Sequence, residues 1–242
     1  MTASEEQNTK PLVGSLSAVL ADALRAYDQN DLPRVEEILR QVLEAVPNAD
    51  IAWHLRGLTA QKRGDLDNAS RYLGEAQRRA SANPIFNRDL GAVLLATGSA
   101  NEALRHLRMA AELDQTDPAT RFQMANAQAR IGDFTGAIKN YRHCISKQPE
   151  SHEAFNNLSF ALRRNSQVPS AIAAARKSLA LFPDFSDALN NLGLALCDAR
   201  QYPEAIENFR AAIEISPGNS EIVNNLGVAI HANGDLAEAA HI

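Results

Sequence analysis

Apolar and small residues recur along this chain with a fixed spacing of 34 positions. Glycines and prolines follow the same spacing, so the pattern extends to residues that shape turns. Self-similarity at a period of roughly 20–50 residues is the sequence signature of a repeat protein. The most regular series consists of alanines: Ala69, Ala103, Ala137, Ala171, Ala205 and Ala239. On this frame we number the positions within a repeat as slots 1 to 34, and the repeats start at Leu16, Asp50, Pro84, Pro118, His152, Ser186 and Ser220.

Within each repeat the pattern predicts two helices joined by a tight turn. Slots 8 and 20 carry mostly glycine and alanine, as two closely approaching helices require, and slot 24 carries a larger residue in most repeats. Slot 15 is mostly glycine, which suits the left-handed residue that ends a helix. Nine of the ten prolines fall at slots 1, 18 or 32, and none falls in a helix interior, where it would cost about 3 kcal/mol. We expect helix A over about slots 2–14 and helix B over about slots 18–30.

This pattern resembles the tetratricopeptide repeat (TPR) family, whose unit is a 34-residue helix–turn–helix. The match is best in the sixth repeat, at Leu189, Leu192, Gly193, Tyr202, Ala205, Phe209, Ala212 and Pro217. The resemblance implies an all-α fold, an α-solenoid of helix–turn–helix repeats that forms a right-handed superhelix with helices A lining a concave groove. The array would cover residues 16–242, with a partial repeat from 220. The polar residues 1–15 have no slot, so we expect a disordered tail there.

Composition and charge narrow the range of partners. The net charge is −5, from 24 lysines and arginines against 29 acidic residues, whereas binding to nucleic acid needs a basic face. No stretch approaches the ~20 apolar residues of a membrane span, and the polar, acidic start lacks a secretory signal. Two cysteines, Cys144 and Cys197, are too few for a disulfide framework and favour a reducing compartment. We therefore expect a cytoplasmic protein that binds neither nucleic acid nor a membrane.

Motifs for catalysis are absent from the sequence. None of the common phosphate-binding, dinucleotide-binding, nucleophile-elbow or zinc-protease motifs occurs. The six histidines fall on unrelated slots and form no metal-ligand spacing. We therefore expect no catalytic residues, no metal and no small-molecule cofactor, and predict that this chain is not an enzyme. Trp53, the only tryptophan, and Cys144 are expected to be core residues.

Asparagines stand out on helix A of the later repeats. Slot 6 carries Gln123, Asn157, Asn191 and Asn225, slot 5 carries Asn156, Asn190 and Asn224, and slot 9 of the fourth repeat carries Asn126. Asparagine is a poor residue inside helices because its amide competes for the backbone. Two explanations stay open. The amides either bond between helices of the array, in repeats that duplicated recently, or bind the N–H and C=O groups of an extended peptide.

A peptide-binding role also follows from a resemblance at these positions. The row is similar to the asparagine ladder of the TPR superhelix in O-linked N-acetylglucosamine transferases, which grips peptides by their backbone; it implies this role for Asn157, Asn191 and Asn225. Helices ~8–10 Å apart would bring one asparagine opposite about every third residue of a chain that rises ~3.3 Å per residue. The carboxylate clamp of other TPR proteins does not fit, because Phe122, Asp187 and Asn191 stand where it needs basic residues.

Two functions follow from these features. The first is a protein–protein interaction scaffold that binds an extended peptide or partner protein in the concave groove. The alternative is the substrate-recruiting segment of a longer transferase, similar to the O-linked N-acetylglucosamine transferases or another TPR-fused enzyme. Two features favour the alternative. The seventh repeat stops at Ile242, within an expected helix B near residues 237–242 and without the polar cap that ends most solenoids. The other feature is the row of asparagines, which is similar to that of the transferases.

Overall fold

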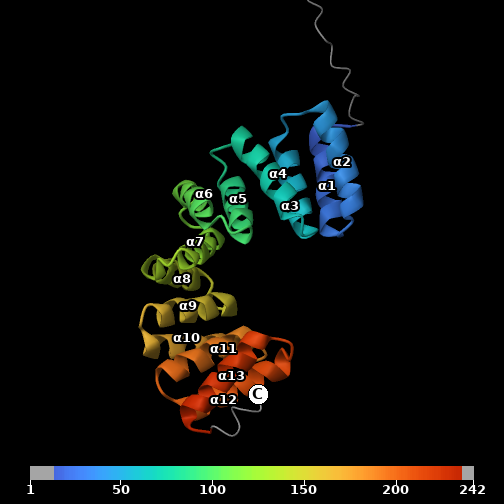
Figure 1. The fold of residues 1–242 in the computed structure, drawn as a ribbon. Coiled ribbons are helices and arrows are strands. Elements are labelled where there is room, and N and C mark those ends of the chain that lie inside the picture. The colour runs from blue at the N-terminus through green and yellow to red at the C-terminus, as the bar shows by residue number, and fades with distance from the viewer. Residues whose placement is uncertain (1–13, 236–242) are drawn as a thin grey trace, which may run out of the picture. The chain divides into compact units, whose positions relative to one another are not determined.

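The computed structural model describes residues 14–235, and all the regular elements of that range are α-helices (Figure 1). The chain divides into two compact units, which we call unit 1 (to Thr116) and unit 2 (from Asp117). The helices of unit 1 are α1 (Leu16–Asp28), α2 (Leu32–Ala45), α3 (Asp50–Lys62), α4 (Leu66–Arg79), α5 (Pro84–Ala96) and α6 (Ala100–Leu113). Those of unit 2 are α7 (Pro118–Arg130), α8 (Phe134–Lys147), α9 (His152–Arg164), α10 (Val168–Leu181), α11 (Ser186–Asp198), α12 (Tyr202–Ile215) and α13 (Ser220–Asn233). Helices A and B alternate, so the predicted all-α solenoid is confirmed.

Helices begin one position earlier than the sequence pattern predicted. Helix A starts at slot 1 and helix B at slot 17. Pro33, Pro169 and Pro203 are therefore the second residues of their helices, not the first. The shift carries no cost, because none of the first four N–H groups of a helix has a partner within it.

Polar side chains fix several of the helix starts. The carboxylates of Asp31, Asp65 and Asp133 each accept a hydrogen bond from the backbone N–H three residues further on. Such a cap satisfies one of the unpaired donors of the first turn. Because the caps stand at slot 16, they set the point at which helix B leaves the turn.

The residue at slot 15, just after helix A, has the same left-handed backbone conformation in all seven repeats. Slot 15 has a positive φ in each of them, between 60° and 98°. Glycine occupies four of these positions, and the others are Asn30, Ser166 and Arg200. A side chain is unfavourable in this left-handed region. The turn therefore follows from the packing of the two helices and not from glycine alone.

The core of each repeat is the contact between slot 8 of helix A and slot 24 of helix B. A Cβ added at Gly57 would lie 2.5 Å from Leu73 Cγ, and one at Gly193 would lie 2.6 Å from Phe209 Cε1. Leu73 and Phe209 are fully buried. The residue at slot 20 has no exposed surface in any of the first six repeats. The small residues thus let the helices approach until the slot 24 side chain fills the space between them.

Two sequence expectations fall mainly outside the described residues. The disordered tail was expected over residues 1–15, of which only Gly14 and Ser15 are described. The hydroxyl of Ser15 accepts a hydrogen bond from the N–H of Ala18 and caps α1. The short helix B expected at 237–242 also lies outside the described range. Between residues 14 and 235, no helix has the length and apolar character that a membrane crossing needs.

The contact between slots 8 and 24 predicts opposite effects for two glycines of the second repeat. Gly57→Ala should lower the free energy of unfolding by about 1–2 kcal/mol. Overpacking destabilises by about 1–3 kcal/mol, and the higher helix propensity of alanine offsets up to about 1 kcal/mol of this loss. Gly74→Ala is the matched control, since a Cβ at this α4 position meets nothing within 4 Å; it should raise stability by about 0.5–1 kcal/mol. Urea unfolding followed by circular dichroism measures both. Equal stabilisation by the two changes would contradict the close approach.

Candidate peptide-binding face

The predicted site residues lie on the helices A of unit 2. Slots 5, 6 and 9 of α7, α9, α11 and α13 face the same way because the helices repeat one register. Neighbouring helices A pack against each other here: α7 with α9, α9 with α11, and α11 with α13. We call the surface formed by slots 2, 5, 6, 9, 12 and 13 of these four helices the A face.

Hydrogen bonds join the asparagines of neighbouring helices. Asn191 Nδ2 donates to Asn156 Oδ1 at 2.8 Å, and Asn225 Nδ2 donates to Asn190 Oδ1 at 3.0 Å. Both bonds run from slot 6 of one repeat to slot 5 of the repeat before it, and we call such a pair a rung. These bonds offset the low helix propensity of asparagine, because each amide finds a partner across the helix interface. The first of the two explanations for the asparagines therefore holds for these pairs.

Asn157 belongs to a denser network than the other slot 6 residues. Its Nδ2 donates to Asn126 Oδ1 at 3.1 Å, and its Oδ1 accepts from Asn156 Nδ2 at 3.3 Å. Asn126 Oδ1 also accepts from the hydroxyl of Tyr141 at 2.6 Å, and Asn126 Nδ2 donates to Gln123 Oε1 at 3.5 Å. Burial raises the pKa of Tyr141, so its hydroxyl stays protonated and able to donate. Both polar atoms of Asn157 are thus already engaged, and Gln123 and Asn126 are tied to the same network.

Asn191 and Asn225 keep hydrogen-bonding capacity toward solvent. Both side chains are half-buried, and their Oδ1 atoms have no protein partner within residues 14–235. The rung holds Nδ2 against the preceding helix, which turns Oδ1 away from it because the amide is planar. Asn224, at slot 5 of the last described helix, is exposed. We predicted the same role for all three slot 6 asparagines from the sequence, whereas the hydrogen bonds of Asn157 differ from those of Asn191 and Asn225.

Two further rows of side chains accompany the rungs. Slot 2 carries acidic residues that are exposed on three successive helices: Glu153, Asp187 and Glu221. Slot 9 carries apolar residues on the same helices, Phe160, Leu194 and Val228, and Val228 is 61% exposed. The spacing of 34 between Leu194 and Val228 could have identified this row, but aliphatic residues on a repeat protein are usually assigned to its core. The A face thus combines amide, apolar and acidic rows.

The two arginines at slots 12 and 13 of α9 are engaged by neighbouring groups. The Arg163 guanidinium lies 3.4 Å from Asp198 of the next helix A. Arg164 Cζ lies 5.1 Å from the ring centre of Phe134 and 5.9 Å from that of Phe160. These contacts are cation–π interactions, which hold the guanidinium against apolar rings. At slots 2, 5, 6 and 9 of α9, α11 and α13 the exposed acidic row supplies the charge, whereas Arg130 at slot 13 of α7 adds an exposed positive group.

Unit 1 contains a charged version of the rung. His54 stands at slot 5 and Asp89 at slot 6 of the following repeat, with His54 Nε2 2.7 Å from Asp89 Oδ2. Arg88 Nε donates to the other carboxylate oxygen at 2.9 Å. Burial raises the pKa of Asp89, but the hydrogen bonds from His54 and Arg88 outweigh burial and hold it below its ordinary value. The same two slots therefore join neighbouring helices A in both units.

The repeat pattern and its geometry agree with one protein family. The model of the tetratricopeptide repeat family matches residues 54–118, 122–184, 161–220 and 190–242, which make up more than half of the chain. The chain belongs to the tetratricopeptide repeat family. It is also similar to the tetratricopeptide repeat-containing protein trd-1 of Caenorhabditis elegans, with 30% identity over 151 residues. That stretch is 62% of this chain and 18% of the worm protein, so the chain spans about a fifth of that relative.

Solved structures with the same fold have varied descriptions. Cut9–Hcn1, a hetero-tetramer of the APC/C, gives a TM-score of 0.75 at 18% identity over 88% of this chain and 42% of that chain. PilW, described as a type IV pilus biogenesis factor, gives a TM-score of 0.76 at 17% identity, and the match covers 87% of this chain and 97% of the PilW chain. YrrB, described as a TPR protein with an unusual peptide-binding site, gives a TM-score of 0.64 at 22% identity, and the match covers 76% of this chain and 92% of the YrrB chain. At these identities the likeness shows the fold alone.

The equivalence of the rungs in the two units predicts a rescue. Asp89→Ala should lower the free energy of unfolding by about 1–3 kcal/mol, because it leaves the half-buried His54 without its acceptor. The double variant His54→Asn/Asp89→Asn rebuilds the pair found in unit 2 and should recover most of that loss. Urea unfolding of the variants measures both effects. A double variant no more stable than Asp89→Ala would contradict the equivalence.

The ionised rung also predicts a pH dependence. Because the pKa of folded Asp89 lies below the ordinary value of 3.8, its ionisation contributes stability that is fully present above pH 3.8 and lost as the pH falls through the folded pKa. The stability difference between the wild type and Asp89→Asn should shrink over that window. A difference that stays constant down to acid unfolding would contradict the assignment.

Proposed function

We propose that this chain is a protein–protein interaction scaffold whose A face binds an extended peptide by its backbone. The observation that carries the proposal is the pair of side-chain carbonyl oxygens of the half-buried Asn191 and Asn225, which their rungs orient and which have no protein partner within residues 14–235. An ordered acceptor suits a peptide N–H, since the amide does not have to be immobilised on binding.

The spacing of the rungs fits the repeat of an extended chain. Packed helices lie ~8–10 Å apart, and an extended peptide rises ~3.3 Å per residue. Equivalent atoms on neighbouring helices A therefore meet about every third peptide residue. Asn191 and Asn225 are the main contacts in this proposal, with Asn190 and Asn224 beside them. Asn157, Asn156, Asn126 and Gln123 then act mainly by holding the helices in register.

The rows beside the rungs suggest the side chains of the peptide. Phe160, Leu194 and Val228 offer apolar surface, of which Val228 is the most exposed. Glu153, Asp187 and Glu221 add one exposed carboxylate per repeat. Opposite charge steers association and disfavours wrong partners. We therefore propose a peptide that combines apolar residues with lysine or arginine, held mainly through its backbone.

The alternative function uses the same face. If the array recruits substrates for a longer transferase, the peptide becomes a substrate segment and the contacts stay as described. The chain spans only 18% of trd-1 and 42% of the matched chain of Cut9–Hcn1, so repeats of this kind occur in longer proteins. Reading the gene beyond Ile242 distinguishes a self-standing scaffold from a segment that recruits substrates for catalysis.

The backbone contacts predict a loss of affinity on changing two asparagines. Linear peptides selected from a random display library against the full chain serve as probes. Asn191→Ala/Asn225→Ala should weaken their binding by about 1–3 kcal/mol, because the peptide loses two hydrogen bonds. The helicity of the chain should not change. Methylation of single peptide N–H groups should weaken binding more than alanine substitution of the neighbouring side chains. Isothermal titration measures both series.

Asn208→Ala provides the matched control. Asn208 lies on α12, where its Nδ2 donates to the backbone oxygen of Glu204 at 2.8 Å. The change removes an amide of the same size from a helix B and should leave peptide affinity unchanged. Unchanged affinity in the double variant, or equal losses in the variant and the control, would rule out a backbone-binding A face.

A further inference from the structure

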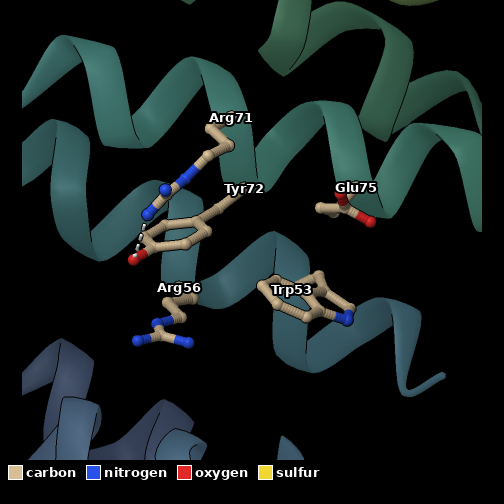
Figure 2. Close-up of a pocket in the computed structure, with 5 residues that line it drawn as sticks. All are labelled: Trp53, Arg56, Arg71, Tyr72 and Glu75. Carbon is tan, nitrogen blue, oxygen red and sulfur yellow. Dashed lines mark hydrogen bonds between the residues drawn. The ribbon is translucent and has the colours of Figure 1, made fainter. Parts of the chain in front are cut away.

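Unit 1 contains a pocket that lies apart from the asparagine row. It has a volume of about 370 Å³ and is lined by Trp53 and Arg56 of α3 and by Arg71, Tyr72 and Glu75 of α4 (Figure 2). The sequence led us to expect Trp53 in the core. It packs against the core of unit 1 but stays partly exposed, and its Nε1–H donates to the backbone oxygen of Pro47 at 2.8 Å.

The repeat frame shows how this pocket arises. Slots 4 and 23 face each other in several repeats: they carry Asn87 and His106 in the third, 3.4 Å apart, and Arg121 and Asn140 in the fourth, 3.5 Å apart. In the second repeat they carry two aromatic rings, Trp53 and Tyr72, with ring centres 5.8 Å apart. The pocket is therefore a regular position of the repeat that has acquired aromatic walls.

Arg56 departs from the rest of the array. It occupies slot 7, where five of the seven repeats bury an apolar side chain: Leu90, Met124, Leu158, Leu192 and Leu226. The Arg56 guanidinium lies 4.5 Å from the ring centre of Tyr72 and 5.9 Å from that of Trp53. Within the described part of the chain it has no hydrogen bond or ion pair. A buried charge normally finds an acidic partner, whereas the N–H donors of the half-buried Arg56 have no protein partner among residues 14–235.

Positive charge exceeds negative charge around the pocket. Figure 2 shows the Tyr72 ring between Arg56 and Arg71, and Arg71 Cζ lies 4.9 Å from the ring centre. Glu75 is the only carboxylate in the lining, and it is paired with Arg78 and Arg79. Hydrogen bonding by Arg79 in particular keeps the pKa of Glu75 below its ordinary value. The two arginines of the lining, Arg56 and Arg71, thus have no carboxylate in an ion pair, while the one glutamate is already paired.

The geometry points to a binding site for an aryl phosphate, such as the phosphorylated tyrosine side chain of a partner protein. The planar fork of Arg56 matches two phosphate oxygens, and the charge surplus suits a group that carries −1.5 to −2 charges. Trp53 supplies an apolar wall against which an aromatic ring can pack, while Tyr72 holds the guanidinium groups of Arg56 and Arg71 against its two faces. The pocket belongs to unit 1, so this inference does not depend on the peptide-binding role of unit 2.

Trp53 makes the site directly measurable, because it is the only tryptophan of the chain. Titration of the full chain with phenyl phosphate should change its fluorescence in a saturable way. Inorganic phosphate should bind roughly 3–10-fold more weakly because it cannot stack, and benzoate should also bind more weakly because it carries less charge. A short peptide with phosphotyrosine should bind at least as tightly as phenyl phosphate.

Arg56→Leu separates binding from folding. It restores the kind of residue that slot 7 carries elsewhere, so its melting temperature should equal or exceed that of the wild type. Its affinity for phenyl phosphate should fall at least ten-fold, the loss of one charge-assisted pair of hydrogen bonds. Arg105→Gln is the charge control: Arg105 occupies slot 22 of the next repeat, pairs with Glu102 on the surface and should not affect binding.

Several outcomes would overturn the inference. They are a fluorescence that phenyl phosphate leaves unchanged, equal affinities for phenyl and inorganic phosphate, and full binding by Arg56→Leu. A phosphotyrosine peptide that binds more weakly than phenyl phosphate would contradict a protein partner. If Arg56→Leu melts well below the wild type and still binds, then Arg56 is a packing residue.

Discussion

The close approach of two helices at slots 8 and 24 is the constraint on which the rest of this structure depends. A glycine such as Gly57 or Gly193 leaves no room for a Cβ, because Leu73 or Phe209 already fills the space. This contact fixes the angle and the distance between helices A and B. The left-handed residue at slot 15 follows from it, even where the residue is Ser166 or Arg200. Repetition of one packed pair then brings equivalent slots into equivalent places.

Regular placement explains how polar groups can build a face on a solenoid. Slot 6 of one helix A contacts slot 5 of the helix A before it. In unit 2 this contact joins Asn191 to Asn156, and in unit 1 it joins Asp89 to His54. The rung satisfies groups that would otherwise be costly at a helix interface. It also orders the remaining atoms of each amide, which makes the same residues suitable for binding. Structural and functional explanations of the asparagines are therefore compatible.

The sequence predicted the architecture well because the period of 34 residues records the packing directly. Small, large and turn residues each recur at the slot where the structure needs them, and helix starts were placed within one residue. The site was harder to predict. Which atoms of Asn157 are engaged depends on Asn126 and Tyr141 of the preceding repeat, hence on the offset between helices. The pocket at Arg56 was missed for a related reason: the sequence shows the departure at slot 7, but only the packing of the helices brings Trp53 and Tyr72 beside Arg56.

Side-chain amide resonances of the full chain test the central claim most directly. A ¹⁵N nuclear magnetic resonance titration with a selected peptide follows every asparagine at once. The account predicts that the amides of Asn191 and Asn225 shift on binding and exchange their hydrogens more slowly, while that of Asn208 stays unchanged. Bound peptide that leaves Asn191 and Asn225 unchanged, and shifts residues of helices B in their place, would contradict it.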